Sequence, residues 1–286
     1  MESQQAVIER YFVADSDNST LATIETNDDG QFELELKEKI ALTHDTNKFI
    51  FKLPDENQVL GLNVCGHLIF HLPLEDGDSI SRKYTPVSQL NERGTVTFVI
   101  KTYKKCDEFP NGGKMSQHLE SLEVGAKVKM EGPFGLLAYI GFGTFTLKKT
   151  KIQKTKIGII AGGTGITPCF QLVQASTLAD DGLQMVMLYS NKSKDDILVK
   201  DELDQLSQQN TNNLKLYHTL TRHDDEKHGE WTGLKGRVSA EHIKQCRFPE
   251  PSSDTLIVYC GPAAFGKTVE EVLTSLGYTK EMMHKF

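Results

Sequence analysis

Two different hydrophobic patterns follow one another along this chain, and the change between them lies near residue 156. From about residue 31, apolar and polar residues alternate in short runs, for example at Phe32–Leu36, Phe49–Leu53 and Val96–Ile100. Alternation with period two, broken by Gly and Pro, is typical of antiparallel strands that bury one face. Several such runs within ~100 residues predict a small barrel or sandwich.

Beyond residue 156, short apolar runs alternate with amphipathic stretches of helical period. Lys156–Ala161 and Met185–Tyr189 are such runs, and Leu214–Leu220 and Thr255–Tyr259 repeat the pattern. Strands that alternate with helices predict a parallel sheet covered on both faces. A chain of 286 residues has room for two domains. We therefore expect a two-domain α+β protein with a polar N-terminal extension at 1–29, a β domain at 30–140, a lysine-rich linker at 141–156 and an α/β domain at 157–286.

The bulk composition excludes several classes of protein. A net charge of −7 argues against a nucleic-acid partner. The five cysteines are odd in number and form no C-x-x-C pair, so we expect a reducing compartment, no disulfide framework and no bound metal. No uncharged apolar run approaches the ~18 residues that a spanning helix needs, and the first residues lack the form of a signal peptide. We expect a cytoplasmic protein, soluble or peripheral on the cytosolic face of a membrane, whose chain supplies no anchor.

A glycine-rich loop follows the first apolar run of the second half. Gly162, Gly163, Thr164 and Gly165 precede Thr167, which is expected at a helix N-cap, and Pro168, which is expected at the first helical position. Glycines bring bare backbone close to a diphosphate, which the N–H groups of a helix start then bind. The loop is not G-x-G-x-x-G, and an ordinary βα turn is the alternative interpretation.

A second glycine motif offers a rival function. Gly261–Thr268 satisfies G-x-x-x-x-G-K-[ST] and follows an apolar strand, which is the pattern of a nucleoside triphosphatase. Such an enzyme also needs a strand aspartate for magnesium, usually downstream, and little chain follows Thr268. Pro262 moreover lacks a backbone N–H where the loop needs one. We therefore keep this interpretation only as a remote alternative.

A third group of residues suits a flavin. Arg82 and Tyr84 lie two positions apart and share one face of a strand, where a guanidinium suits a diphosphate and a phenol ring suits a flat cofactor. The Thr85 hydroxyl is a candidate partner for a ring nitrogen. Gly112-Gly113 would bring backbone to a phosphate, and Met115-Ser116 open a helix-like segment. Taken alone, Arg82 and Tyr84 would be a plain surface pair.

Together these motifs identify a family by resemblance. The chain from about Phe32 to Phe286 resembles the NADH-cytochrome b5 reductase family of ferredoxin-reductase-like flavoenzymes, on the motifs Leu42–Thr46, Arg82–Ser88, Val99–Tyr103, Phe109–Ser116, Glu131–Leu136, Gly162–Pro168, Cys260–Pro262 and Phe286. The resemblance implies an antiparallel Greek-key β-barrel that binds FAD, followed by a Rossmann-like parallel sheet that binds NAD. It implies a reductase that passes a hydride from NADH to FAD N5, and then single electrons to cytochrome b5 or a similar haem acceptor.

The resemblance also implies roles by position. The FAD site would comprise Arg82, Tyr84, Thr85, Val99, Lys101, Tyr103, Gly113, Lys114, Met115, Ser116 and Thr167. The NADH site would comprise Gly162, Gly163, Thr164, Gly165, Pro168, Thr221, Arg222, Cys260, Gly261, Pro262 and Phe286. Thr85 would act near flavin N5, Cys260 would position the nicotinamide, and His44 would lie near the flavin edge. A structural role is the alternative for Cys260 and His44, and is what we expect of His67.

The chain departs from the family pattern at the end of its third predicted α/β strand. Thr221-Arg222 stand where the family tends to carry an acidic residue that binds the adenosine ribose. A carboxylate there repels the 2′-phosphate of NADPH, so Thr221 should weaken discrimination while NADH remains slightly preferred. Ala263-Ala264 replace two prolines of the family, which loosens that loop.

Cytochrome b5 is acidic, so the resemblance predicts a basic docking face. Its candidates are Lys148, Lys149, Lys101 and Lys114, although the lysines from 148 onward are equally consistent with a solvated linker. We expect a monomer. Two other functions stay open: the reductase module of a larger system such as nitrate reductase, and a flavin-binding module that no longer turns over.

Overall fold

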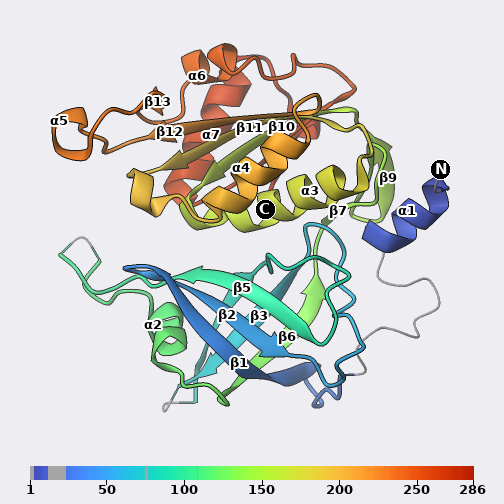
Figure 1. Ribbon diagram of the computed structural model, residues 1–286, viewed down its shortest axis with the longest axis vertical. Helices are drawn as coiled ribbons and strands as arrows, with labels where there is room; N and C mark the ends of the chain where they lie inside the picture. The colour runs from blue at the N-terminus through green and yellow to red at the C-terminus, as the bar shows by residue number, and fades with distance from the viewer. Residues whose placement is uncertain (1–2, 12–23, 75–76, 108) are drawn as a thin grey trace. The chain divides into compact units, whose positions relative to one another are not determined.

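The computed structural model describes residues 3–11, 24–74, 77–107 and 109–286. The chain divides into two compact units, Met1–Ala138 and Tyr139–Phe286 (Figure 1). Each unit has its own hydrophobic core. Within the described part, no helix is long and apolar enough to cross a membrane. The expected order, an antiparallel β domain followed by a parallel α/β domain, is confirmed.

The first unit is built on one antiparallel sheet. Its strands are β1 (Gln31–Thr43), β2 (Thr46–Lys52), β3 (His67–Pro73), β4 (Ser79–Tyr84), β5 (Thr95–Lys101) and β6 (Lys127–Phe134), in the spatial order β4-β3-β6-β1-β2-β5. The N–H of Val87 donates to the carbonyl of Thr97 at 2.8 Å, which joins the segment after β4 to β5, at the opposite end of that order. The sheet therefore closes on itself as a barrel. Helix α2 (Lys114–Ser121) lies between β5 and β6 in the chain.

The period-two pattern produces the barrel core. Residues at alternate positions of β1, namely Phe32, Leu34 and Leu36, are at most 4% exposed. Phe70 makes edge-on contacts with Phe51 and Phe98, with ring centroids 5.8 and 4.9 Å apart. Such contacts stabilise aromatic pairs beyond the burial of their area.

The N-terminal extension is described only in part. Residues 4–11 form helix α1 (Gln4–Tyr11), and residues 12–23, part of the expected polar extension, lie outside the described residues. Ile24 packs against the barrel core, so the extension is attached to the first unit by its end.

The second unit carries a parallel sheet with helices on both faces. Its strands are β10 (Lys156–Gly162), β11 (Gln184–Asn191), β12 (Leu214–Leu220), β13 (Leu234–Lys235), β14 (Thr255–Cys260) and β15 (Met283–Lys285), in the order β13-β12-β11-β10-β14-β15. Figure 1 shows α3 (Ile166–Ala179) and α4 (Lys200–Gln209) on one face, and α6 (Ala240–Gln245) and α7 (Ala263–Ser275) on the other. A short helix, α5 (Asp225–His228), lies between β12 and β13 in the chain.

The strand order reverses between β10 and β14. Beyond β10 the chain adds β11 and β12 on one side, and then returns to place β14 on the other side. In open α/β sheets a ligand binds outside the carboxyl ends of the strands at such a switch point. This topology therefore directs attention to the loops that follow β10 and β14.

The segment 141–156, which we expected to be a linker, folds as a hairpin. Strands β7 (Leu137–Tyr139), β8 (Thr144–Leu147) and β9 (Thr150–Gln153) form a three-stranded sheet. The turn residues Lys148 and Lys149 both have positive φ, 48° and 70°, as a two-residue hairpin turn requires. Phe145 is fully buried against Tyr139, whose hydroxyl donates to Asp181. The sequence did not predict this hairpin, because lysines occupy its turn and its solvent-exposed face and so resemble a polar linker.

Candidate functional site

Arg82 and Tyr84 lie on β4 with different environments. Tyr84 is half-buried, and its ring packs on Phe70 with centroids 4.8 Å apart. Burial raises the pKa of Tyr84 to about 12, although the Arg82 charge opposes the shift. Arg82 is exposed, and its Nη1 donates to the adjacent carbonyl of Ser81 at 2.7 Å. No carboxylate among the described residues forms an ion pair with Arg82, so its guanidinium is available to an anion.

The segment after β4 is fixed against β5. Besides the bond that closes the barrel, the N–H of Thr97 donates to Ser88 Oγ at 3.1 Å. Thr85 and Val99 are 9% and 4% exposed, so both are nearly covered by the protein. The sequence predicted both residues for the flavin site, and both are packed into the first unit.

The loop before α2 requires its two glycines. The Gly113 N–H donates to Tyr103 O at 2.8 Å, and the Tyr103 N–H donates to Ser116 Oγ at 3.1 Å. A Cβ on Gly113 would lie 2.6 Å from Ser116 Oγ. Gly112 has φ +58°, and a Cβ there would lie 2.6 Å from Tyr103 O. Tyr103 itself is 42% exposed.

Helix α2 begins at Lys114 without a side-chain cap. The N–H groups of Lys114, Met115 and Ser116 are in the first turn, where a helix offers no internal acceptor and carries a partial positive charge. At the other end, Lys39 Nζ donates to the carbonyls of Glu120 and Leu122 at 2.7 and 2.6 Å. The helix is therefore held at its carboxyl end while its amino end is open to an anion.

Lys101 and His44 meet at a residue that the sequence did not single out. Lys101 Nζ lies 2.8 Å from Asp45 Oδ2, and His44 Nε2 lies 3.4 Å from the same oxygen. Burial raises the pKa of Asp45, but the hydrogen bond and charge of Lys101 outweigh it and hold that pKa below its usual range. Asp45 could have been found from its position directly before β2. The next residue, Thr46, pairs with Lys101 on β5, which brings Asp45 next to Lys101.

The glycine loop of the second unit differs in detail from its prediction. The N-cap of α3 is Gly165, and the helix begins at Ile166 after a short 3-10 turn, η1 (Gly163–Gly165). Thr167 and Pro168 therefore lie inside the first turn, each two positions later in the helix than we expected. Proline is still tolerated there, because its missing N–H would have had no helical partner.

The glycine loop lies against the end of β14. A Cβ on Gly165 would lie 2.3 Å from Cys260 O, and a Cβ on Gly261 would lie 2.4 Å from the ring of Phe265. Tyr189, which is fully buried, donates its hydroxyl to Gly163 O at 3.1 Å and so fixes the loop from β11. The two segments predicted to bind the nucleotide are thus adjacent at the switch point.

Cys260 is the last residue of β14. Burial raises the pKa of its thiol to about 11, although the nearby Lys285 opposes the shift. The thiol is therefore protonated at neutral pH, which suits a positioning role and not nucleophilic attack. The N–H of Phe286 donates to Tyr259 O at 3.1 Å, so the last residue lies beside the strand that carries Cys260.

The triphosphatase interpretation fails on geometry. Helix α7 begins at Ala263, so Gly266 and Thr268 lie within a helix and not in a phosphate loop. Gly266 is buried, and the Thr268 hydroxyl donates to the backbone of Ala264 at 3.2 Å. The local match to the motif is therefore coincidental.

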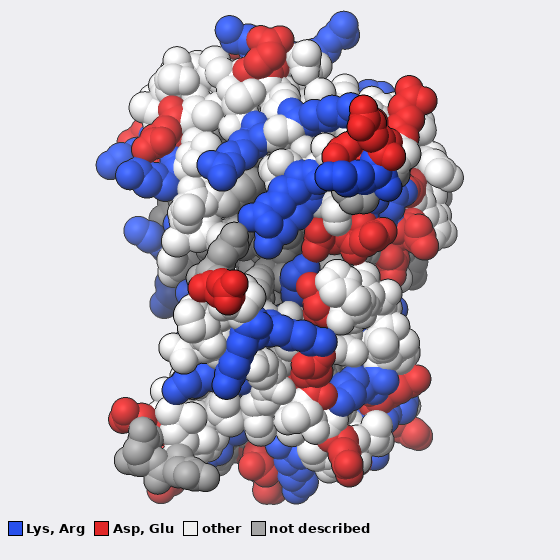
Figure 2. Space-filling model, turned by 90° about the vertical axis from the view of Figure 1, so that its left-hand side faces the viewer, with Lys and Arg blue, Asp and Glu red and all other residues white. Residues whose placement is uncertain are grey.

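Thr221 and Arg222 follow β12 at the same edge of the sheet. The Thr221 hydroxyl donates to Asn191 O at 3.3 Å, so it is directed toward the end of β11. Arg222 is exposed. On the second unit, Figure 2 shows Lys and Arg side chains gathered on the face where these strands end, with acidic side chains among them.

Two other expectations concern surface residues. Lys148 and Lys149 are exposed at the hairpin tip and Lys114 is exposed at the start of α2, but Lys101 is half-buried and paired with Asp45. His67 is half-buried, and its ring centroid lies 6.3 Å from that of Phe134. Burial lowers the pKa of His67, and the Lys83 charge adds to that shift.

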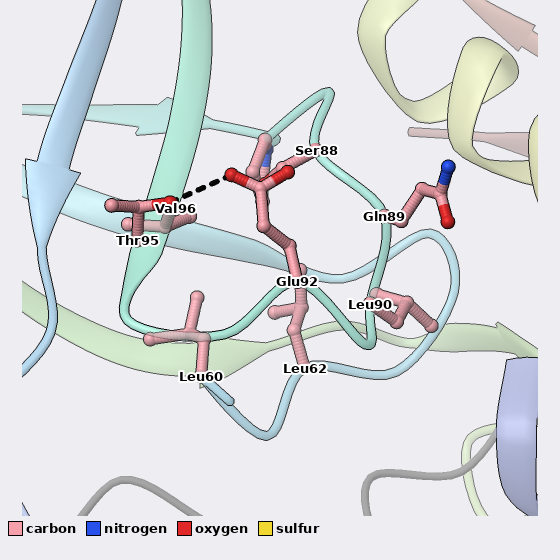
Figure 3. Close-up of a pocket in the computed structure, with 9 residues that line it drawn as sticks. Leu60, Leu62, Ser88, Gln89, Leu90, Glu92, Thr95 and Val96 are labelled. Carbon is pink, nitrogen blue, oxygen red and sulfur yellow. Dashed lines mark hydrogen bonds between the residues drawn. The ribbon is translucent and has the colours of Figure 1, made fainter. Parts of the chain in front are cut away.

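A small pocket lies beside the segment that follows Thr85 (Figure 3). It is lined by Leu60, Leu62, Pro86, Ser88, Gln89, Leu90, Glu92, Thr95 and Val96. The Thr95 hydroxyl donates to Glu92 Oε1 at 2.7 Å across its wall. None of the residues predicted to bind a cofactor lines it, so we do not assign it to the cofactor site.

The known proteins that this chain resembles agree with both predicted cofactor-binding regions. The family model of an oxidoreductase FAD-binding domain matches residues 33–139, and that of an oxidoreductase NAD-binding domain matches residues 159–271. NADH-cytochrome b5 reductase 2 of Xenopus laevis is 39% identical over 258 residues, which cover 87% of this chain and 85% of that protein. NADH-cytochrome b5 reductase 1 of Homo sapiens is 36% identical over 95% of this chain and 90% of that protein.

The solved structures agree with the sequence relatives. The cytochrome b5 reductase domain of Ulva prolifera nitrate reductase superposes with a TM-score of 0.84 and 32% identity, over 91% of this chain and 99% of that domain. The chain belongs to the NADH-cytochrome b5 reductase family.

Proposed function

We propose that this chain is an FAD-dependent reductase that takes a hydride from NADH and passes electrons one at a time to cytochrome b5 or a similar haem protein. The observation that carries the proposal is the 39% identity to a cytochrome b5 reductase over 87% of the chain. The geometry supports it, because each unit offers its own anion site: Arg82 with the α2 N-terminus in the first, and the Gly163–Gly165 turn in the second.

In the first unit, Arg82 and the backbone of Gly113, Met115 and Ser116 would hold the FAD diphosphate. Tyr84 would pack on the isoalloxazine ring, and Thr85 would donate a hydrogen bond near N5. Val99, Lys101 and Tyr103 would lie along the cofactor, and His44 would lie near its exposed edge. When bound, FAD supplies the two-electron to one-electron conversion, while the protein sets distance, angle and exclusion of water.

In the second unit, Gly163, Thr164 and Gly165 would receive the dinucleotide diphosphate at the start of α3, with Gly162 and Pro168 shaping the loop. Cys260, Gly261 and Pro262 would lie beside the nicotinamide, with Phe286 next to them. A neutral thiol at Cys260 would pack against the ring without reacting with it. Thr221 and Arg222 would face the adenosine end of the dinucleotide.

The electron acceptor would dock on exposed lysines. Lys148 and Lys149 at the hairpin tip and Lys114 at the start of α2 are exposed cations that suit an acidic haem protein. Lys101 is not among these docking residues, because the carboxylate of Asp45 balances its charge. We propose a monomer, and a cytoplasmic location in solution or at the cytosolic face of a membrane, since five cysteines that form no disulfide suit a reducing compartment.

A second candidate is the reductase module of a larger electron-transfer system. The nitrate reductase of Volvox carteri is 36% identical over 89% of this chain, which spans only 30% of that protein. In that case the acceptor would be a haem domain joined to the chain.

The spectrum of the purified protein tests the proposal. We expect the bands of an oxidised flavin, and their rapid loss when NADH is added without oxygen. Catalytic reduction of added cytochrome b5 should follow, and would favour a free acceptor over a fused one. A folded protein that retains no flavin when FAD is supplied in excess would refute the function. A flavin that NADH does not reduce would indicate a binding module.

A further inference from the structure

Three polar side chains form a hydrogen-bonded row on the outside of the barrel. Ser81 Oγ lies 2.9 Å from His71 Nδ1, and His71 Nε2 lies 3.1 Å from Glu131 Oε2. The three residues come from β4, β3 and β6, which are consecutive neighbours in the sheet. Leu68 and Phe70 on β3 are fully buried, so His71 is directed to the opposite face of the sheet. None of the three is a residue that we expect to hold a cofactor.

The hydrogen bonds give this row a direction. A carboxylate only accepts hydrogen bonds, so Glu131 keeps the imidazole proton on Nε2 of His71. The other nitrogen, Nδ1, then carries no proton and accepts the hydrogen bond of the Ser81 hydroxyl. An imidazole that a carboxylate orients and that accepts from a hydroxyl is the arrangement that activates a serine as a nucleophile.

Burial differs along the row in the way that such chemistry needs. The side chains of His71 and Glu131 are only 11% and 30% exposed, so the base and the group that orients it are largely covered. Ser81 is exposed, so its hydroxyl is open to a molecule that arrives from the solvent. The strand register places His71 directly opposite Ser81, and cross-strand side chains of this kind are neighbours. The sheet therefore holds the base beside the hydroxyl.

An open groove lies on the same face of the sheet. It has a volume of about 640 Å³ and is lined in part by Lys129 and Gln31, the cross-strand partners of His71 and Glu131. Ile24 and Pro54 add apolar surface to it. Strands β4 and β6 are two strand spacings apart, or ~10 Å, so an extended acyl chain attached at β4 would reach the groove.

We propose that Ser81, His71 and Glu131 form a second catalytic site, which hydrolyses carboxylic esters with apolar acyl chains. Ser81 and His71 would be the catalytic residues, and Glu131 would be a positioning residue. Lys83, exposed two positions further along β4 and on the same face as Ser81, would stabilise the negative charge that develops on the carbonyl oxygen. The inference goes beyond the proposed reductase, because it uses neither FAD nor NADH.

The reaction proceeds in two steps that conserve atoms and protons. Ser81 Oγ attacks the carbonyl carbon of the ester, and its proton passes to His71 Nδ1. The bond between the carbonyl carbon and the alcohol oxygen then breaks, and that oxygen takes the proton from Nδ1. A water molecule attacks the acyl-serine in the same way, which releases the carboxylic acid and restores the Ser81 hydroxyl.

Covalent labelling tests whether Ser81 is activated. The full chain is treated with diisopropyl fluorophosphate, which phosphorylates a nucleophilic serine and loses fluoride, and the modified peptide is found by mass spectrometry. We expect modification at Ser81. Ser79 is the matched control, because it is an exposed serine on the same strand and the same face, opposite Pro73 and not opposite a histidine. Labelling of Ser79 as fast as that of Ser81, or of neither, would overturn the proposal.

Hydrolysis of p-nitrophenyl octanoate assigns the roles. Ser81→Ala and His71→Gln should each lower kcat/KM by about 100-fold, since general-base activation is lost. Ser79→Ala should leave it unchanged. Thermal unfolding identifies any variant that fails to fold, and Ser81→Ala alters only an exposed hydroxyl. Hydrolysis that survives Ser81→Ala would show that surface lysines and histidines cleave the ester and would overturn the proposal.

Two further readouts separate positioning and binding from general stability. Glu131→Gln should lower kcat by about tenfold with little change in KM, because this carboxylate does not touch the ester. A change in KM alone would contradict the positioning role. In the unaltered protein, KM for p-nitrophenyl octanoate should be about tenfold lower than that for p-nitrophenyl acetate, because the longer chain buries apolar surface in the groove. Equal KM values would overturn the proposed substrate class.

The outcome is separable from that of the proposed function. Ester hydrolysis is measured without NADH, so a failure of the reductase assignment would leave it untouched. Neighbouring side chains on a strand point to opposite faces, so Ser81→Ala should not disturb the Arg82 guanidinium or the flavin content of the protein. If hydrolysis is absent while NADH reduces the flavin, the second site is wrong and the reductase assignment stands.

Discussion

Asp45 holds the ammonium group of Lys101 at 2.8 Å, and the two side chains are only 15% and 18% exposed. His44 approaches the same carboxylate at 3.4 Å but is 71% exposed. The turn between β1 and β2 thus presents one carboxylate to a lysine and a histidine that the family resemblance places near the flavin. Asp45 positions both residues, although it would not itself touch the cofactor.

Replacing Asp45 should destabilise the first unit and change its response to acid. Asp45→Asn leaves Lys101 without its partner, and we expect a loss of about 1–3 kcal/mol in the free energy of unfolding at pH 7. The native pKa of Asp45 is lowered, so its stabilising effect is complete above the unfolded value of ~3.9 and disappears as the pH falls through the native value. Urea unfolding of the wild type and Asp45→Asn at pH 7 and pH 3 measures both effects, and the difference between the two proteins should be smaller at the lower pH. Asp28→Asn, at an exposed position, is the control.

Replacing Arg82 should weaken FAD binding through the diphosphate alone. Arg82→Gln removes charge-assisted hydrogen bonds worth about 2 kcal/mol, so the Kd for FAD should rise by ~30-fold. Fluorescence titration of the apoprotein measures the Kd. Riboflavin has no phosphate and serves as the control ligand, whose affinity should change little. An equal loss for both ligands would show that Arg82 supports the fold of the site and not the diphosphate.

The Cys260 thiol should resist alkylation at pH 8. Its pKa of about 11 leaves a thiolate fraction of ~10⁻³ at that pH, and only the thiolate reacts. Cys106 is exposed and should be modified much earlier. Timed treatment with iodoacetamide followed by peptide mass spectrometry gives both rates, and Cys106→Ser should remove the rapid phase. Modification of Cys260 as fast as that of Cys106 would contradict the burial described above.

A methyl group at Gly165 should disrupt the contact between the two nucleotide segments. In Gly165→Ala the new Cβ would lie 2.3 Å from the carbonyl oxygen of Cys260, which forces the backbone apart. Overpacking of this kind costs about 1–3 kcal/mol, and thermal unfolding of the protein should show a lower Tm. Gly135→Ala is the matched control, since its nearest neighbouring atom is 3.4 Å away and no positive φ is involved. An unchanged Tm for Gly165→Ala would mean that the two segments are not in contact.

Charge reversal at the hairpin tip should slow the reduction of an acidic acceptor. For the double variant Lys148→Glu and Lys149→Glu, kcat/KM for cytochrome b5 should fall by about tenfold at low salt, and its salt dependence should flatten. Ferricyanide reduction should change less, because a small oxidant needs no docking surface. Lys37→Glu reverses an exposed charge on β1 and serves as the control. If the Lys37 variant lowered kcat/KM as much as the hairpin variant, the change would reflect net charge and not docking at the hairpin.

The periodic segments of the sequence predicted their structures because burial imposes the period. Phe32, Leu34 and Leu36 alternate in the sequence and are all buried in the barrel. The hairpin 141–156 escaped prediction because only Phe145 marks its buried face, while lysines occupy the rest. The start of α3 was misplaced by two residues, because Gly165 caps it through backbone conformation without any side-chain hydrogen bond.

Tertiary pairing explains what no local pattern indicated. Asp45 forms an ion pair with Lys101, which lies on another strand, and no sequence pattern indicates that pairing. The Gly261–Thr268 motif shows the converse: its residues match a phosphate-loop pattern, but from Ala263 onward they form helix α7.

The bond from Val87 to Thr97 has a consequence for how this protein behaves when concentrated. A closed barrel presents no long row of unpaired backbone groups onto which another molecule could add a strand. In the second unit the outermost strands β13 and β15 have only two and three residues, too few to template such growth. Resistance to edge-to-edge aggregation is therefore a property of the backbone topology, and it should survive changes in surface charge.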